Sequence, residues 1–319
     1  MDITSVAHRV APGSGGDRKL TVRTRLSRLR RPRRSSSFTA FVLGAPYTIH
    51  FLTFVALPFL YTIALSLMNY NMYNPVRTFV GLENFQTLLF SDDIFLKSVR
   101  NTLYFVAFRV TGVVGLGMGM AILLNRKLRG IKFFRTVFYF PVVVDWVIVS
   151  IVWLFFLSPV GLANRFLSAN GLPRQPFFES TVQAMPLIII MSVWKDVAYY
   201  AVMLLAGLQD VPGELVEAAH IDGANSWQTL WLVILPWLAP VLLLVIIMAS
   251  INSLRVFTQV YVMTQGGPID STMTVMMYLY NTAFRYLQMG YGSAIAVIWF
   301  LVVLVLVLIQ RRVLGRYGR

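Results

Sequence analysis

Four ionisable residues interrupt stretches of the chain that are otherwise apolar, namely Arg109, Asp145, Lys195 and Asp196. A charge near the middle of a membrane costs about 2.5 to 3.5 kcal/mol on insertion scales, so such groups usually face a bundle interior and have partners. One interpretation is structural ion pairing, for which Arg109 and Asp145 are one candidate pair. The other is that some of these groups, together with Asn252, line a path that offers hydrogen bonds to a polar solute.

Catalytic and metal-binding chemistry lack the residues that they require. The chain has no cysteine, which excludes disulfides, thiolate ligands and cysteine nucleophiles, and its three histidines are scattered. No G-x-x-x-x-G-K-[ST] loop surrounds any of the five lysines, so the chain does not hydrolyse ATP by the P-loop route. An enzyme embedded in a membrane would need clustered His, Asp or Glu. We expect no catalytic residues, no metal and no cofactor on this chain.

Composition places these residues in a membrane protein. Of 319 residues, 57% are hydrophobic and only 13% are charged, whereas a soluble globular chain carries about 25% charged residues. The net charge of +15 would suggest nucleic acid, but nine arginines and one lysine lie within residues 1–34 and four more arginines close the chain. Basic residues that flank apolar segments are typical of membrane proteins. We therefore expect membrane lipid, and no nucleic acid, as a partner.

The elements that carry the charges are six apolar stretches. A helix needs about 20 mostly apolar residues to cross the hydrocarbon layer. The stretches that qualify lie at about 41–67, 102–124, 136–157, 184–208, 229–254 and 291–310. We predict an all-α integral membrane protein with six transmembrane helices in residues 38–319, preceded by a disordered, basic cytoplasmic tail, residues 1–37.

The distribution of Lys and Arg between the connections predicts the orientation. With the amino terminus inside, the inner segments carry nineteen basic residues and the outer connections carry seven. Basic residues accumulate in cytoplasmic loops, so we predict that both termini are cytoplasmic. The inner connection at 209–228 has no Lys or Arg and needs a separate explanation.

That connection predicts a short helix, a break and a second helix. Pro212 suits a first helical turn, and Glu214 and Glu217 then lie near its positive end. Gly223 favours a stop, and a second helix from about Asn225 would continue into the fifth span. The first helix presents a small, alanine-rich face. This face either packs against the protein's own bundle or permits close approach of another protein.

The same residues carry a resemblance to a known family. The chain reads Glu217-Ala218-Ala219, three residues, Gly223, nine residues, and then Val233-Ile234-Leu235-Pro236. This resembles the EAA signature of permease subunits in binding-protein-dependent ABC importers, which ends in I-x-L-P or close to it. Further matching segments are Asn101-Thr102, Phe134 to Pro141, Trp153 with Gly161 and Asn164, Trp194 to Gln209, and Thr264-Gln265-Gly266-Gly267-Pro268. The last is similar to the T-x-G-G-P turn of the carbohydrate type, found in maltose and glycerol-phosphate importers, and the resemblance covers about residues 38–319.

The resemblance implies a function and several partners. In the family this connection is a cytoplasmic coupling helix, between helices four and five, that docks on an ATPase subunit. By analogy, the docking residues are Glu217, Ala218, Ala219, Asp222 and Gly223. The chain would be a permease that moves a sugar or sugar-like solute by alternating access, with ATP used by the partner ATPase. It would work with a second permease and an extracytoplasmic solute-binding protein in a bacterial or archaeal cell (inner) membrane.

An ion-coupled secondary transporter is the alternative function. Intramembrane charges would permit proton coupling, and the coupling loop would then be an ordinary connection. A requirement for ATP and a partner ATPase distinguishes the two. Independently, Gly115 and Gly119 form a G-x-x-x-G pair that predicts close helix packing, within the bundle or against a partner permease.

Overall fold

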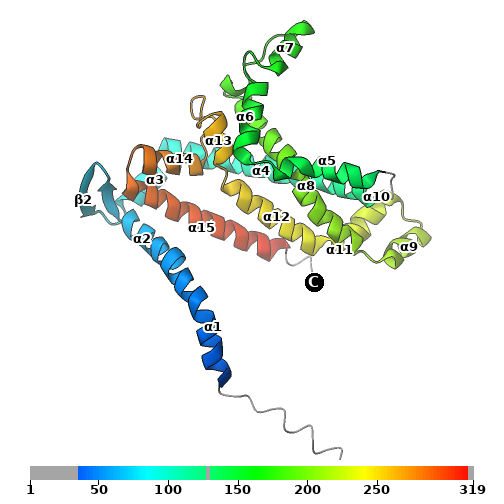
Figure 1. Ribbon diagram of the computed structural model, residues 1–319, viewed down its shortest axis with the longest axis horizontal. Helices are drawn as coiled ribbons and strands as arrows, with labels where there is room; N and C mark the ends of the chain where they lie inside the picture. Colours follow the sequence, from blue (N-terminus) through cyan, green and yellow to red (C-terminus); the bar gives the residue numbers. More distant parts are fainter. Residues whose placement is uncertain (1–34, 127–129, 315–319) are drawn as a thin grey trace, which may run out of the picture. The chain divides into compact units, whose positions relative to one another are not determined.

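The computed structural model describes residues 35–126 and 130–314, and these are mostly helical (Figure 1). The chain divides into two compact units, 1–58 and 59–319. The predicted basic tail, residues 1–37, lies outside the described residues except for its last three.

Helices make up nearly all of the regular structure, and one small hairpin follows the second of them. The helices are α1 (Ser35–Phe51), α2 (Leu57–Ser66), α3 (Glu83–Phe90), α4 (Asp93–Asn125), α5 (Ile131–Val143), α6 (Trp146–Phe156), α7 (Leu162–Ala169), α8 (Ala184–Gln209), α9 (Gly213–Ile221), α10 (Ser226–Thr229), α11 (Leu235–Trp237), α12 (Ala239–Leu254), α13 (Thr258–Met263), α14 (Val275–Tyr280) and α15 (Met289–Leu314). Short π or 3-10 turns are η1 (Leu52–Ala56), η2 (Phe177–Glu179), η3 (Leu230–Ile234) and η4 (Asn281–Arg285). An antiparallel hairpin joins β1 (Met68–Asn71) to β2 (Asn74–Phe79), with Met68 opposite Phe79.

The first candidate span is Leu43–Ser66, a helical segment that passes through the π turn η1. Its apolar side chains are largely exposed, as at Leu43 and Phe54. A helix that is apolar around its circumference and buries little of it in protein suits a lipid environment.

Four long helices of the second unit, α4, α8, α12 and α15, run side by side (Figure 1). The most extensive packing is between α4 and α8. Phe105 and Val113 of α4 and Ile188 and Leu204 of α8 are fully buried there. This seam brings Arg109 of α4 next to Asp196 of α8.

The close approach of α4 to α8 depends on glycines other than the predicted pair. A Cβ added at Gly112 would lie 2.8 Å from a methyl group of Val193, and Gly117 faces the α8 backbone. Gly115 and Gly119 have no heavy atom within 4 Å of such a Cβ. The G-x-x-x-G pair therefore does not pack within the described part of the bundle, contrary to the first of its two predicted roles.

The predicted third span, 136–157, is broken. Helices α5 and α6 meet at an angle of 95° across Val144 and Asp145, which both have extended backbone. The Asp145 carboxylate accepts a hydrogen bond of 2.8 Å from the Val147 amide and so caps α6. An aspartate in this position starts a new helix, which is why this mostly apolar stretch does not form one straight span.

The predicted fifth span, 229–254, begins too early. Its first ten residues form the end of α10, the π turn η3 and the short helix α11, and the candidate span is Ala239–Met263. Pro236 and Pro240 lack a backbone N–H, so the regular hydrogen-bond ladder is interrupted between the two segments.

Five helices of the described chain are long and apolar enough to cross a membrane, or six if the bent pair α5 and α6 counts as one span. The chain is thus a multi-pass helical membrane protein.

Polar side chains fix the end of the bundle at which α4 begins. Asp92 caps α4 at the Phe95 amide and also accepts hydrogen bonds from the hydroxyls of Tyr278 and Tyr291, at 2.6 and 2.7 Å. Burial raises the pKa of Tyr278, and its bond to the Asp92 carboxylate raises it further, so the phenol remains a donor. The contacts join α4, α14 and α15.

The loop that contains Thr264-Gln265-Gly266-Gly267-Pro268 is held at the same end. Asn101 donates from its side-chain amide to the carbonyls of Asp270 and Met273, at 2.9 and 3.0 Å. The Thr102 hydroxyl accepts from the Val275 amide at 3.0 Å. Both members of the Asn101-Thr102 pair therefore hold the loop between α13 and α14 against α4.

Candidate functional site

Four of the five residues predicted for the solute path line one cavity, which we call the polar cavity. It has a volume of about 470 Å³ and lies between α4, α8, α12 and the bend of α5 and α6. The polar lining residues are Arg109, Lys195, Asp196, Tyr199, Tyr200, Asn252, Arg255, Thr258 and Gln259. A cavity with this lining can hydrogen-bond a polar molecule inside an otherwise apolar bundle.

Arg109 is the most constrained of these residues, with 2% of it exposed. Its guanidinium pairs with the Asp196 carboxylate of α8 and donates to the Ala249 carbonyl and Ser253 hydroxyl of α12, at 3.2 and 2.6 Å. Its Nε has no partner among the described residues. The side chain thus joins three helices, and its charge is compensated by Asp196, so the candidate pair with Asp145 does not form.

Lys195 faces the bend between α5 and α6. Its ammonium lies 3.4 Å from the Val142 carbonyl and 4.4 Å from the centroid of the Trp146 ring. The last carbonyls of a helix lack intrahelical donors and carry partial negative charge, so a cation is favourable there. An indole face adds a cation–π attraction. Lys195 therefore stabilises the broken span.

Asn252 completes the cavity from α12. Its amide donates to the Tyr200 hydroxyl at 3.2 Å, and the rings of Tyr199 and Tyr200 lie edge to face. Asp145, the fifth predicted residue, is exposed, caps α6 and does not line the polar cavity.

The two tyrosines of the polar cavity were not predicted from the sequence. A signal for them was present, since Tyr199 and Tyr200 follow Lys195 and Asp196 by four residues and so share their helix faces. No comparable signal pointed to Trp146, because its place at the cavity depends on the bend of the third span.

Aromatic rings extend from the rim of the polar cavity. Phe257, which lines the cavity, stacks on Tyr261 with ring centroids 5.3 Å apart. Tyr280 contacts both rings, and Phe284 contacts Tyr280 at 5.6 Å. We call these four residues the aromatic ladder.

The predicted coupling loop has the expected local structure. Helix α9 follows Pro212, and Gly223 has a φ of +84°, in the left-handed region that favours glycine. Asn225 then caps α10 in a capping box with Gln228. The helix, break and second helix are therefore confirmed, and each has a local cause.

The five predicted docking residues occupy the exposed side of this loop. Glu217, Ala218, Asp222 and Gly223 are exposed, and Ala219 is half-buried. Large apolar side chains are exposed beside them, with 86% of Ile221 and 67% of Trp227 accessible. Exposed apolar groups that form a contiguous patch occur at contacts with protein or with the membrane. Figure 1 shows α9 and α10 at the opposite end of the bundle from α3 and α14.

A bundle with a buried charged cavity and an exposed helical loop defines a membrane transport component. Residues 113–318 match the family described as binding-protein-dependent transport system inner membrane component. The chain belongs to this family.

Named transport proteins are similar to this chain over most of its length. The diacetylchitobiose uptake system permease protein NgcF of Streptomyces coelicolor is 38% identical over 88% of this chain and 84% of its own length. The multiple sugar-binding transport system permease protein MsmF of Streptococcus mutans is 37% identical over 73% and 80%. The trehalose/maltose permease protein MalF of Thermococcus litoralis is 34% identical over 84% and 90%.

Among solved structures, a chain of a bacterial alginate ABC transporter, crystallised with its alginate-bound periplasmic protein, has the same fold. The TM-score is 0.78 at 23% identity, with 89% of this chain and 96% of that chain covered.

Proposed function

We propose that this chain is the transmembrane permease subunit of an ABC importer and that its solute is a sugar or a sugar-like molecule. The family and the relatives named for diacetylchitobiose, multiple sugars and trehalose or maltose support the proposal. The observation that carries it in this chain is the polar cavity. Asp196 of α8 and Asn252 of α12 line it together with Arg255, which forms no ion pair within the described residues.

The chemistry of the polar cavity fits a carbohydrate. Sugar hydroxyls both donate and accept hydrogen bonds, and Asn252, Tyr200 and Gln259 can do the same. A sugar also has apolar faces of C–H groups, which suit the aromatic ladder at the rim. The Arg109–Asp196 pair holds two charges in place, and Lys195 and Arg255 add cationic donors that can hydrogen-bond sugar hydroxyls.

Six spans with both termini in the cytoplasm are the topology that we propose. The bend of α5 and α6 then counts as one span, and α9 lies on the cytoplasmic side. This arrangement is supported by the distribution of basic residues, because Lys and Arg accumulate on the inner side. The proposed location of the protein is the membrane of a bacterial or archaeal cell.

The coupling loop would receive the work of ATP hydrolysis. We assign docking on the ATPase to Glu217, Ala218, Ala219, Asp222 and Gly223, whose exposure supports the role. A loop that binds protein does not need the basic residues that contact lipid headgroups, which explains their absence from 209–228. A second permease and a solute-binding protein complete the proposed assembly, with ATP bound by the partner and no catalytic residue, metal or cofactor on this chain.

Uptake of radiolabelled oligosaccharides in cells that carry the full transport operon tests the proposal. We expect uptake to require ATP and to persist with a protonophore. Asn252→Ala should lower uptake about tenfold or more, because it removes a hydrogen-bonding group from the cavity, whereas Asn170→Ala, at the end of α7, should leave it unchanged. Uptake that stops with the protonophore while ATP remains high would instead support ion coupling.

A further inference from the structure

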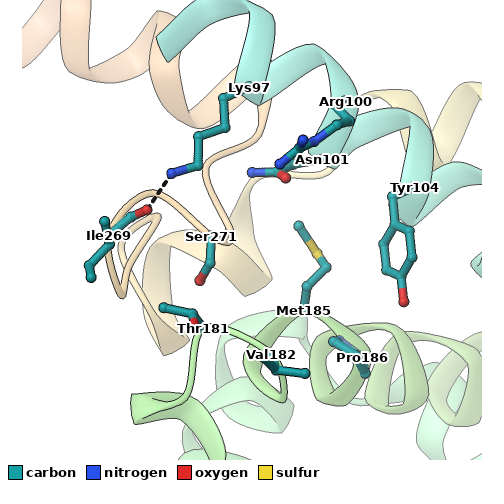
Figure 2. Close-up of a pocket in the computed structure, with 10 residues that line it drawn as sticks. All are labelled: Lys97, Arg100, Asn101, Tyr104, Thr181, Val182, Met185, Pro186, Ile269 and Ser271. Atoms are coloured by element: carbon teal, nitrogen blue, oxygen red, sulfur yellow. Dashed lines mark hydrogen bonds between the residues drawn. The ribbon is translucent and has the colours of Figure 1, made fainter. Parts of the chain in front are cut away.

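A second cavity lies near the amino-terminal end of α4, and we call it the cationic cavity (Figure 2). Its volume is about 460 Å³. Figure 2 shows the side chains of Lys97, Arg100, Asn101 and Tyr104 entering from α4, with Ile269 and Ser271 of the loop after α13 on one side and Thr181 to Pro186 opposite. It shares no residue with the polar cavity.

The two cations of this cavity are uncompensated. Lys97 and Arg100 are three residues apart on α4, which places them on one helix face. Neither forms an ion pair with a carboxylate anywhere in residues 35–126 and 130–314. Lys97 donates one hydrogen bond, at 2.6 Å, to the Ile269 carbonyl, and an ammonium has two further donors. No acidic side chain of the described chain lines the cavity.

One neutral polar group, the Ser271 hydroxyl, adds a hydrogen-bond donor to the cavity. The Ser271 hydroxyl is buried and has no hydrogen-bond partner in the part of the chain that the structure describes, although a buried hydroxyl is normally satisfied. Asn101 is not available, because its amide already holds the Asp270 and Met273 carbonyls. These bonds hold the loop against α4, so Ser271 stays beside the helical turn that carries Lys97 and Arg100. A group of donors with a charge of +2 is a receptor for an anion.

The depth of the cavity indicates the source of that anion. Helix α4 has 33 residues, which corresponds to about 50 Å, whereas the hydrocarbon layer is about 30 Å thick. Lys97 and Arg100 lie within the first eight residues of the helix, before the apolar run that begins at Thr102. They therefore lie at the level of the lipid headgroups. Tyr104, which is 42% exposed one turn further on, is a typical interfacial residue.

We propose that the cationic cavity binds the phosphate group of an anionic phospholipid. Lys97 and Arg100 supply the charge, and the Ser271 hydroxyl donates to a phosphate oxygen. Basic pockets between transmembrane helices bind lipid headgroups by the same chemistry on the cytoplasmic side, and in the topology proposed above Lys97 and Arg100 would do so at the outer surface. Bound lipid would hold α4, the loop after α13 and the start of α8 together at one membrane surface.

Native mass spectrometry of the full chain in neutral detergent, titrated with phosphatidylglycerol or phosphatidylcholine, tests this proposal. We expect preferential binding of phosphatidylglycerol, an affinity about 5-fold lower in Arg100→Gln, and one about 30-fold lower in Lys97→Gln/Arg100→Gln. The Arg100 side chain has no hydrogen bond to another described residue, so Arg100→Gln removes a charge without breaking a contact of the described fold. The control Arg165→Gln/Arg174→Gln removes two exposed charges elsewhere and should change the affinity less than twofold.

Three results would overturn the proposal. Equal affinity of the wild type and the double variant for phosphatidylglycerol would show that the cavity does not bind this lipid. Displacement of the lipid by millimolar inorganic phosphate, together with an equal loss of phosphate binding in the double variant, would assign the site to a soluble anion. Unchanged lipid binding with loss of uptake would assign Lys97 and Arg100 to a carboxylate of a protein partner.

Discussion

The Arg109–Asp196 pair provides the sharpest test of how the polar cavity is built. Asp196→Asn keeps the shape of the side chain but leaves the guanidinium, which is 2% exposed, without a counter-charge. Breaking a buried pair in this way costs about 3 to 5 kcal/mol. Arg109 keeps its bonds to Ala249 and Ser253, so we expect a loss near the lower limit, about 3 kcal/mol, in the free energy of unfolding.

The assay is unfolding of the purified chain in mixed micelles by sodium dodecyl sulfate, followed by tryptophan fluorescence. Arg109→Gln, Asp196→Asn and the double variant form a cycle, and the double variant should lose about 1 to 3 kcal/mol less than the sum of the single variants. Arg255 lines the same cavity but forms no ion pair with any described residue. Arg255→Gln should therefore leave the free energy of unfolding nearly unchanged. A cost below about 1 kcal/mol for Asp196→Asn, or strict additivity, would refute the reasoning.

Three other predictions concern packing, the loop after α13 and the coupling loop. Gly112→Ala should lower stability by about 1 to 3 kcal/mol through overpacking, whereas Gly115→Ala, with open space around it, should be neutral or stabilising; equal thermal shifts would contradict this. Asn101→Ala breaks two hydrogen bonds to the loop and should cost about 1 to 3 kcal/mol, with faster amide hydrogen exchange confined to residues 264–275. Gly223→Val forces a branched side chain into a left-handed turn and should abolish ATPase co-purification while membrane insertion remains, and normal co-purification would exclude the role.

Local sequence signals predicted the local structure of the proposed coupling loop well. Proline, glycine and asparagine determine the start, break and restart of its helices through contacts within a few residues. The same kind of signal was present at Asp145, which caps α6, but the apolar residues on both sides concealed the break. Hydrophobicity thus predicted which segments lie in the membrane better than it predicted where helices bend.

Long-range partners could not be predicted from the sequence. Arg109 and Asp196 are 87 residues apart, and their pairing depends on the rotation of α4 against α8. Gly112 and Gly117, rather than the predicted pair Gly115 and Gly119, determine how closely these helices approach. The sequence left ion pairing and a polar path open for the four charges, and the packing of the helices selected Asp196 as the partner of Arg109.

Site-directed labelling at position 218 tests the central claim most directly. The chain has no cysteine, so Ala218→Cys carries a single thiol, and Val182→Cys, exposed at the other end of α8, is its matched control. A membrane-impermeant maleimide added to intact spheroplasts should label position 182 and not 218. In inside-out vesicles it should label 218, and excess partner ATPase should block that reaction. Labelling of 218 from the outside, or labelling that the ATPase does not affect, would contradict the account of an inward-facing coupling helix.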